Sequence, residues 1–129
     1  MKEVRDGLPY VDYDICYGRR VVGSIELILA SNETSYYYGN IGYHIDKKYR
    51  GHHFAKEACI LVMEEAARDF DMHEFIITCN PDNIPSIKTI EGLPKWSFVE
   101  RVKVPKSHPL YKQGEREKLV YRVSLWEIY

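Results

Sequence analysis

A long amphipathic segment in the middle of the chain limits the possible folds more than any other feature. From Phe54 to Phe70, apolar residues recur at spacings of three and four and form one stripe: Ala55, Ala58, Cys59, Val62, Ala66 and Phe70. Charged residues such as Glu57 and Arg68 lie off this stripe. This period is that of an α-helix that packs one face on a core. The segment therefore predicts a single amphipathic helix over Phe54–Phe70.

Strands are predicted before this helix. Pro9–Tyr17 alternates apolar and polar residues, which is the period of a half-buried strand. Arg20–Ala30 is rich in Val, Ile and Leu, and a turn at Gly18 is expected to join the two strands as a hairpin. After the polar loop Ser31–Ser35, Tyr36–Ile45 is predicted as a third strand. The chain up to the long helix is thus predicted to be mainly strand.

Shorter elements are predicted after the helix. His73–Cys79 is almost continuously apolar, which favours a central strand buried on both faces. Ile84–Glu91 reads as a short helix with proline in its first turn, and Trp96–Val104 and Lys118–Ile128 read as strands around the polar excursion Pro105–Glu117. These elements predict an α+β domain with a mixed, mostly antiparallel sheet. The strands that flank the long helix are expected to pair in parallel, because a helical crossover joins parallel strands.

Composition narrows the class of protein. A length of 129 residues fits one domain over residues 1–129. The net charge of -1 argues against a general nucleic-acid-binding protein, which carries a basic stripe. Three widely spaced cysteines, Cys16, Cys59 and Cys79, fit neither a disulfide framework nor a zinc site. The sequence also lacks the apolar runs of a signal peptide or a membrane span. We therefore expect a cytoplasmic protein that binds neither nucleic acid nor membranes.

The loop before the long helix carries the strongest chemical signal. Asp46–His53 contains Lys47, Lys48 and Arg50 beside Gly51, and the helix begins directly after it. A helix N-terminus offers unpaired N–H groups and the positive end of the helix dipole to an anion. The loop lacks the Lys-Ser/Thr of a nucleotide P-loop and the glycine spacing of a dinucleotide fingerprint. It predicts a phosphate or pyrophosphate site, and the alternative is a solvated basic loop with a turn glycine.

The segment Arg50–Ala55 (RGHHFA) resembles the pyrophosphate loop of the GNAT family of N-acetyltransferases, whose pattern is Arg/Gln-x-x-Gly-x-Gly/Ala. Arg50 and Ala55 match the first and last positions, and Gly51 matches the Arg-Gly pair often seen there. His53 replaces the inner glycine. This departure would weaken one backbone–phosphate contact if that position required a backbone conformation open to glycine alone.

Two further segments resemble the same family. Ile41–Ile45 (IGYHI) is similar to the strand that precedes the loop, which in that family splays from its neighbour and pairs by backbone with the pantetheine arm. Asn83 and Ser86 match the family's Asn-x-x-Ser segment, although taken alone they are ordinary turn and capping residues. The tail Trp96–Leu125 is similar to a small bacterial subgroup of unassigned substrate. The resemblance covers Pro9–Leu125.

The resemblance implies a GNAT-like fold with a β-α-β core that binds acetyl-CoA, and no metal. The coenzyme-binding residues that it implies are Tyr43, His44, Ile45, Arg50, Gly51, His52, His53, Phe54, Ala55, Asn83 and Ser86. The implied reaction is direct acetyl transfer to a primary amine of a small molecule or a protein in a ternary complex. The family's usual first strand and first two helices have no counterpart in the sequence. We therefore expect an open acceptor cleft, or one that a second subunit closes in a homodimer.

The acid and base of such a reaction are less clearly marked. Glu26, which is charged in the middle of an apolar run, and His44, which can titrate near neutral pH, are the candidate bases. Each has an ordinary alternative, as a solvated carboxylate or as a histidine bonded to backbone. The family often uses a tyrosine as acid four residues after Ser86, but Ile90 stands there. Tyr111 is the candidate acid, with Tyr121 and Cys79 also available.

Three classes of function stay open. The first is an N-acetyltransferase, in which Tyr36–Tyr38 either line the acceptor cleft or pack in the sheet. The second is a non-catalytic acyl-CoA-binding module that has lost the family's residues at His53 and Ile90. The third is an interaction domain without a nucleotide ligand. Binding of acetyl-CoA separates the third class from the first two, and release of free coenzyme A thiol separates the first from the second.

Overall fold

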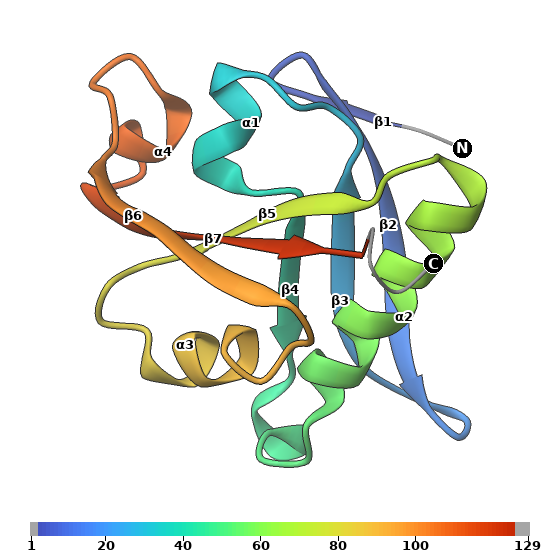
Figure 1. The fold of residues 1–129 in the computed structure, drawn as a ribbon. Helices are drawn as coiled ribbons and strands as arrows, with labels where there is room; N and C mark the ends of the chain where they lie inside the picture. Colours follow the sequence, from blue (N-terminus) through green and yellow to red (C-terminus); the bar gives the residue numbers. More distant parts are fainter. Residues whose placement is uncertain (1–2, 126–129) are drawn as a thin grey trace.

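The computed structural model describes residues 3–125, with the side chains of residues 6–125, as two antiparallel sheets and four α-helices (Figure 1). The elements in chain order are β1 (Glu3–Arg5), β2 (Leu8–Tyr17), β3 (Arg20–Ile28), α1 (Glu33–Tyr38), β4 (Ile41–Ile45), the 3-10 turn η1 (Lys47–Tyr49), α2 (Phe54–Asp69), β5 (Glu74–Cys79), α3 (Ile84–Ile90), β6 (Trp96–Lys103), α4 (Pro109–Lys112) and β7 (Glu117–Ser124). The sheets have the strand orders β1-β2-β3-β4 and β5-β7-β6. The predicted α+β class with mostly antiparallel strands is confirmed.

The predicted hairpin of β2 and β3 forms, and together with β4 it gives the first sheet two unlike faces. Residues directly opposite each other in a ladder share a face. The registers therefore place six polar or small residues on one face: Asp12, Asp14, Ser24, Glu26, Gly42 and His44. The other face carries core residues such as Ile25 and Leu27, which pack with residues of α2. The core thus lies on one side of this sheet, and the opposite face is polar.

Helix α2 confirms the amphipathic stripe. Its buried residues are Ala55, Ala58, Cys59, Val62, Met63 and Ala66. The helix ends at Asp69, and the N–H of Phe70 closes the last turn on the carbonyl of Ala66 at 2.9 Å. The residues of the predicted stripe are the ones that pack in the core, so the sequence period and the buried face of the helix agree.

The prediction of strand over Tyr36–Tyr38 is wrong, because these residues lie in α1. The side chain of Asn32 accepts the N–H of Ser35 at 2.9 Å, and the Ser35 hydroxyl accepts the N–H of Asn32 at 2.8 Å. This reciprocal capping box starts the helix. Gly39, at φ 79°, ends it. Two local caps therefore override the strand propensity of three tyrosines, and the strand begins only at Ile41.

The expected parallel pair around α2 does not form as a ladder, since β4 and β5 belong to different sheets. They meet at Asn40, whose N–H donates to the carbonyl of Ile76 at 2.5 Å and whose Oδ1 accepts the N–H of Ile76 at 2.8 Å. From this joint β4 runs away from β5 (Figure 1). The prediction that β5 is central is also wrong, because β5 is an edge strand that pairs with β7. The N–H of Ile76 bonds to the Asn40 side chain and not to a backbone carbonyl of β4.

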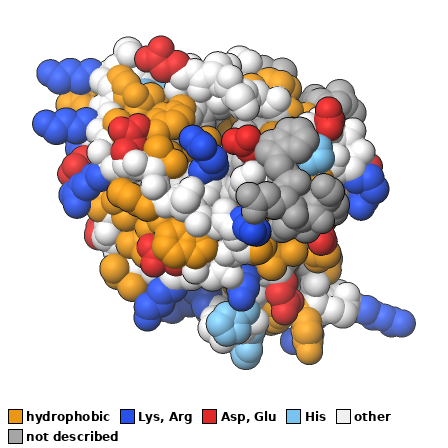
Figure 2. Space-filling view, in the orientation of Figure 1, with side chains coloured by type: hydrophobic (Ala, Val, Ile, Leu, Met, Phe, Trp, Pro, Cys, Tyr) orange, Lys and Arg blue, Asp and Glu red, His pale blue; other side chains and the backbone are white. Residues whose placement is uncertain are grey.

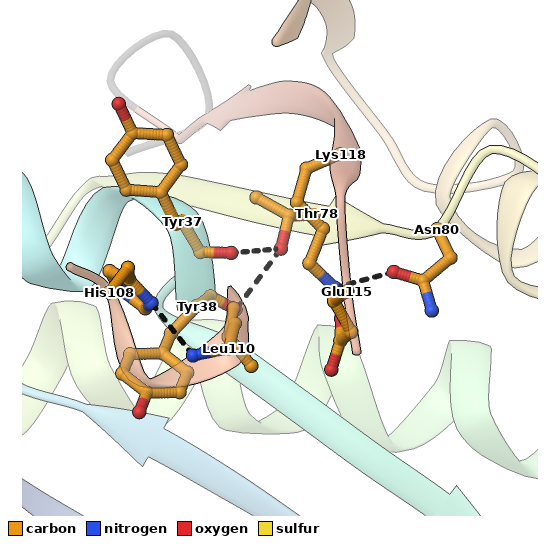
Figure 3. Close-up of polar contacts among 8 residues, drawn as sticks. All are labelled: Tyr37, Tyr38, Thr78, Asn80, His108, Leu110, Glu115 and Lys118. Carbon is orange, nitrogen blue, oxygen red and sulfur yellow. Dashed lines mark hydrogen bonds and ion pairs between the residues drawn. The ribbon is translucent and has the colours of Figure 1, made fainter. Parts of the chain in front are cut away.

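The polar excursion predicted before the last strand contains a short helix, α4, that docks on α1 (Figure 3). His108 caps α4 by accepting the N–H of Leu110 at Nδ1, 3.1 Å away. Its Nε2 lies 2.9 Å from the carbonyl of Thr34, so the tautomer with hydrogen on Nε2 satisfies both contacts. The buried imidazole also contacts the rings of Tyr37 and Tyr38. Tyr37 and Tyr38 of α1 therefore help to hold α4 in place.

The last two predicted strands are found as β6 and β7. The predicted continuation of β7 to Ile128 lies beyond the described residues from position 126 onward. Lys118 of β7 is buried, and its Nζ lies 3.0 Å from Asn80 Oδ1 and 2.5 Å from Glu115 Oε1 (Figure 3). Strand β1, which was not predicted, pairs antiparallel with the start of β2. Within residues 3–125, no helix has the length and apolar character needed to cross a membrane.

Candidate functional site

A cavity of about 570 Å³ lies where the end of β4, the loop before α2 and the start of α3 meet. Its lining contains every coenzyme-binding residue implied by the sequence: Tyr43, His44, Ile45, Arg50, Gly51, His52, His53, Phe54, Ala55, Asn83 and Ser86. Tyr49, Pro85 and Thr89 complete the lining. Three segments far apart in the sequence are thus brought to one cavity. We call it the coenzyme cavity.

The floor of the coenzyme cavity is the start of α2. The first intrahelical bond runs from the N–H of Glu57 to the carbonyl of His53 at 3.1 Å, so the N–H groups of residues 54–56 lie at the open end of the helix. The loop before it is fastened by Arg50, whose Nε donates to the carbonyl of Ile45 at 3.0 Å. Histidine side chains project at this end of the molecule, at the bottom of the space-filling view (Figure 2). Amide donors, exposed lysines and Arg50 together suit a phosphate or pyrophosphate.

His53 keeps the backbone conformation that a glycine would adopt. It stands at the N-cap of α2 with φ 62° and ψ 21°, and Gly51 also has a positive φ of 88°. Left-handed backbone costs a non-glycine residue about 1–2 kcal/mol. His53 adopts this conformation despite the cost, so the backbone of the loop has the shape that the family's inner glycine would give it. The backbone shape does not exclude the phosphate contact that the sequence placed in doubt.

The wall opposite α2 is the first turn of α3. Asn83 caps this helix by accepting the N–H of Ser86 at 3.3 Å, so its ordinary role as a cap is confirmed. From β4, the Tyr43 hydroxyl donates to Ser86 Oγ at 3.1 Å. Burial raises the pKa of Tyr43 from 10.0 to about 12, so the phenol stays neutral at physiological pH. Tyr43 therefore bridges the gap between β4 and α3, and its side chain forms part of the cavity wall.

A second, open cavity of about 580 Å³ lies on the polar face of the first sheet. Its lining is Asp12, Tyr13, Asp14, Ser24, Ile25, Glu26, Gly42, Tyr43 and His44, and we call it the acidic groove. It shares Tyr43 and His44 with the coenzyme cavity. The candidate bases Glu26 and His44 therefore lie in one groove. His44 Nε2 lies 3.5 Å from Asp46 Oδ1, and the His44 side chain is 63% exposed.

The structure does not bring Tyr111 to this groove. Tyr111 lies on α4, where the Arg116 guanidinium stacks over its ring at 3.9 Å. Tyr121 is buried and donates to Glu91 Oε2 at 2.8 Å, and burial followed by this hydrogen bond raises its pKa. Burial also raises the pKa of the Cys79 thiol. None of these three candidate acids lines the coenzyme cavity or the acidic groove.

Sequence analysis missed several residues that line the two cavities. Asp12 and Asp14 join the acidic groove because the register sets them on the same face as Glu26. The sequence predicts the hairpin that holds them, but not the register that sets them opposite Glu26 and Ser24. Thr89 lines the coenzyme cavity one helical turn after Ser86, a spacing that could have identified it. Among the described residues, no three His, Cys, Asp or Glu side chains group as a metal site would require.

Comparisons with known proteins agree with this geometry. The family model described as an acetyltransferase (GNAT) domain matches residues 3–93. An uncharacterized N-acetyltransferase, YnaD of Bacillus subtilis (strain 168), is 28% identical over 90 residues, which are 68% of this chain and 51% of that protein. The chain thus spans about half the length of this curated relative.

Solved structures share the fold at low sequence identity. The microcin C7 self-immunity acetyltransferase MccE, in complex with acetyl-CoA and AMP, has a TM-score of 0.68 at 17% identity, over 89% of this chain and 61% of that one. RimJ of Mycobacterium smegmatis, in complex with CoA-disulfide, has a TM-score of 0.70 at 16% identity, over 95% and 56%. RimL, a ribosomal L7/L12 alpha-N-protein acetyltransferase in complex with coenzyme A, has a TM-score of 0.68 at 19% identity, over 89% and 62%.

Proposed function

Because the chain belongs to the GNAT acetyltransferase family, we propose that it transfers the acetyl group of acetyl-CoA to a primary amine. One observation carries the proposal. The cavity built by the phosphate-type loop and the acidic groove that holds the candidate bases share Tyr43 and His44. A thioester in the first cavity and an amine in the second would therefore approach each other at β4.

Acetyl-CoA is the proposed cosubstrate, and its pyrophosphate is proposed to bind the N–H groups at the start of α2. The glycine-like backbone of His53 and the exposed side chains of Lys47, Lys48 and Arg50 support this placement. Asn83 and Ser86 would contact the pantetheine arm from the other wall. The coenzyme A or acetyl-CoA found in structures of the same fold supports the choice of ligand.

The acceptor is proposed to enter the acidic groove as an ammonium ion, drawn by Asp12, Asp14 and Glu26. Either a small molecule or a protein could supply this amine, because the groove is open. Glu26 or His44, directly or through water, would take one proton and free the nitrogen lone pair. Three carboxylates in one groove favour a cationic acceptor over an anionic one.

In the proposed chemical step the amine nitrogen attacks the thioester carbonyl. The backbone N–H groups of Tyr43 and Ile45, which alternate with the positions that bond to β3, would stabilise the oxyanion. The attacking nitrogen of this intermediate carries a positive charge and gives its second proton to water. Collapse then forms the amide and breaks the carbon–sulfur bond. A free thiol has a pKa of about 8.5, so coenzyme A can leave as a thiolate that takes its proton from water. The step therefore proceeds without Tyr111 as an acid.

The first test is titration of acetyl-CoA into the purified protein by calorimetry, with free coenzyme A and ATP as controls. We expect saturable binding at one site, shared with coenzyme A and not with ATP, that Arg50→Glu sharply weakens. A panel of amines with detection of free thiol then tests transfer. Binding without thiol release from any amine would favour the non-catalytic acyl-CoA-binding module. Absence of acetyl-CoA binding at millimolar concentration would contradict both.

Glu26 can be tested separately from binding. If Glu26 is the base, Glu26→Gln lowers kcat about 100-fold, because the variant has no proton acceptor at this position. The KM for acetyl-CoA is expected to stay unchanged, because Glu26 does not line the coenzyme cavity. Asp12→Asn is the matched control, since Asp12 lies directly opposite Glu26 and is expected to affect mainly the KM for the amine. An unchanged kcat in both Glu26→Gln and His44→Gln would rule out both candidate bases.

A further inference from the structure

Strand β6 is an open edge of the second sheet. The strand order β5-β7-β6 leaves one side of β6 without a partner strand within residues 3–125, and β6 runs along the outside of the sheet (Figure 1). Seven of its eight residues are exposed, and they include Trp96, Phe98 and Val99 at 39%, 52% and 38%. Proteins that stay monomeric usually keep such an edge short, charged or covered. A long edge with three large apolar side chains therefore favours pairing with another strand.

The ladder between β6 and β7 shows which backbone groups of β6 face the open side. At one end of the ladder, the N–H of Ser124 donates to the carbonyl of Lys95 at 3.4 Å. At the other end, the N–H of Val104 donates to the carbonyl of Arg116 at 2.9 Å. Bonded and outward positions alternate along an antiparallel strand, and the alternation shifts once, at the bulge in β6. The outward positions are therefore Trp96, Phe98, Arg101 and Lys103.

The side chains at these four positions share one face of the sheet. Their partners in β7 are alternate residues of one strand: Val123, Tyr121, Leu119 and Glu117. The ring of Tyr121 contacts those of Trp96 and Phe98, with centroids 6.0 and 5.4 Å apart. Farther along the strand, Arg101 and Lys103 bring two cations. The open edge thus has an aromatic half followed by a cationic half on the same face.

This order of residues is self-complementary. When two β6 strands pair antiparallel about a two-fold axis at the middle of the strand, Phe98 lies opposite Arg101 of the partner subunit. In the same register Trp96 lies opposite Lys103 of the partner subunit, so each outward position meets another outward position and their backbone groups can bond. Each pair sets a cation beside an aromatic ring, and symmetry makes each pair twice. The charges that protect the edge against other strands therefore match the rings of a second copy.

We propose that the open edge of β6 is the interface of a homodimer, in which the β5-β7-β6 sheets of two copies join into one continuous sheet. Backbone hydrogen bonds between the two edges supply affinity, and the cation–aromatic pairs fix the register. The inference goes beyond the proposed function and does not depend on it. None of the four outward residues lines the coenzyme cavity or the acidic groove, so interface and site can be tested separately.

The test is sedimentation velocity of the whole chain at protein concentrations from micromolar to millimolar. Phe98→Lys sets a second cation opposite Arg101 of the partner subunit and is expected to raise the dimer dissociation constant about tenfold or more. Phe98→Glu sets a carboxylate opposite the same guanidinium and is expected to keep the dimer, because an ion pair replaces the cation–aromatic contact. Leu61→Lys is the matched control, since Leu61 is 65% exposed and lies on α2. Far-UV circular dichroism shows whether each variant is folded.

Hydrogen exchange provides a second measurement of the same interface. The N–H groups of Trp96, Phe98, Arg101 and Lys103 are expected to exchange more slowly at millimolar than at micromolar protein concentration, because they become bonded only in the dimer.

Three results would overturn the inference. A protein that is monomeric at every concentration has no such interface, and its edge would be left for an extended segment of another protein. Equal dimer affinity in Phe98→Lys and Phe98→Glu would exclude the proposed register. A dimer that Leu61→Lys dissociates and Phe98→Lys does not would place the interface on α2. Acetyl-CoA binding is measured independently, so the proposed function stands in each case.

Discussion

His53 has a backbone conformation that favours glycine, and it lines the coenzyme cavity together with its neighbours. Relief of the left-handed strain should outweigh the larger unfolded-state entropy of glycine. We therefore expect His53→Gly to raise the free energy of unfolding by about 0.5–1 kcal/mol and to keep or improve acetyl-CoA affinity. Chemical denaturation and calorimetry measure the two effects. His53→Val, a β-branched residue that disfavours this conformation, should lower both, and a destabilised His53→Gly variant would contradict the strain argument.

Tyr43 links the site to the pH dependence of stability. Its pKa is raised by burial from 10.0 to about 12, so the unfolded chain loses this proton at lower pH than the folded protein does. The contribution of Tyr43 to stability is therefore complete below about pH 10 and is lost as the pH rises toward 12. The full effect is roughly 2 kcal/mol. Tyr43→Phe, which has no proton to lose, should show a smaller fall in the free energy of unfolding between pH 10 and 12. Equal falls in both proteins would show that Tyr43 does not titrate in this way.

At the scale of elements, α1 depends on its capping box. Asn32→Ala removes the acceptor of the Ser35 N–H and should lower the free energy of unfolding by about 1 kcal/mol. Ser31→Ala is the matched control, since Ser31 is exposed and precedes the cap. Denaturant unfolding of the two variants provides the comparison. Equal stability of Asn32→Ala and the unmodified protein would mean that packing of α4 on the tyrosines, and not the cap, holds α1.

Elements whose signal is local were predicted well. Helix α2 follows from its own apolar stripe. The loop residues 50–55, which are adjacent in the sequence, line one cavity, and their binding of phosphate stays a prediction. Tyr36–Tyr38 were mispredicted because the capping box of Asn32 and Ser35 starts a helix that overrides the strand propensity of tyrosine. Glu26 and His44 of the acidic groove were identified from the sequence as candidate bases. Asp12 and Asp14 were missed, because their positions depend on the register between strands. Tyr111 shows the limit of choosing a residue by type, since only the fold tells which surface it faces.

The whole molecule is organised around the separation of its two sheets. Within residues 3–125, every strand pairs antiparallel with its neighbours, and β4 and β5 belong to different sheets. Beside the gap between them, the Tyr43 hydroxyl reaches Ser86. Basic side chains lie at the lower end of this gap, near η1, and the acidic groove lies on the polar face beside it. The proposed entrance for the coenzyme is therefore basic, and the proposed entrance for the acceptor amine is acidic. The net charge of -1 does not reveal this separation, because the positive and negative charges nearly cancel over the whole chain.

Asn40 holds the two sheets together, which gives a prediction for the molecule as a whole. It is buried, its Nδ2 donates to the carbonyls of Ile28 and Ala30 at 3.1 Å each, and its Oδ1 accepts the N–H of Ile76 at 2.8 Å. Asn40→Ala leaves three backbone groups without these partners, and each such loss costs about 1–3 kcal/mol. We expect a fall of about 3 kcal/mol or more in the free energy of unfolding.

The same variant should also weaken acetyl-CoA binding, because the joint between β4 and β5 keeps its backbone hydrogen bond but loses its side-chain bonds. Asn32→Ala is the matched control, since it makes the same substitution at an exposed cap and should leave acetyl-CoA affinity unchanged. Denaturant unfolding and calorimetry, measured well below the unfolding transition of each variant, separate stability from binding. An Asn40→Ala protein that is destabilised yet binds acetyl-CoA normally would show that the walls at α2 and α3 set the coenzyme cavity without the joint. Weakened binding in the folded variant would show that the joint between the sheets is also part of the site.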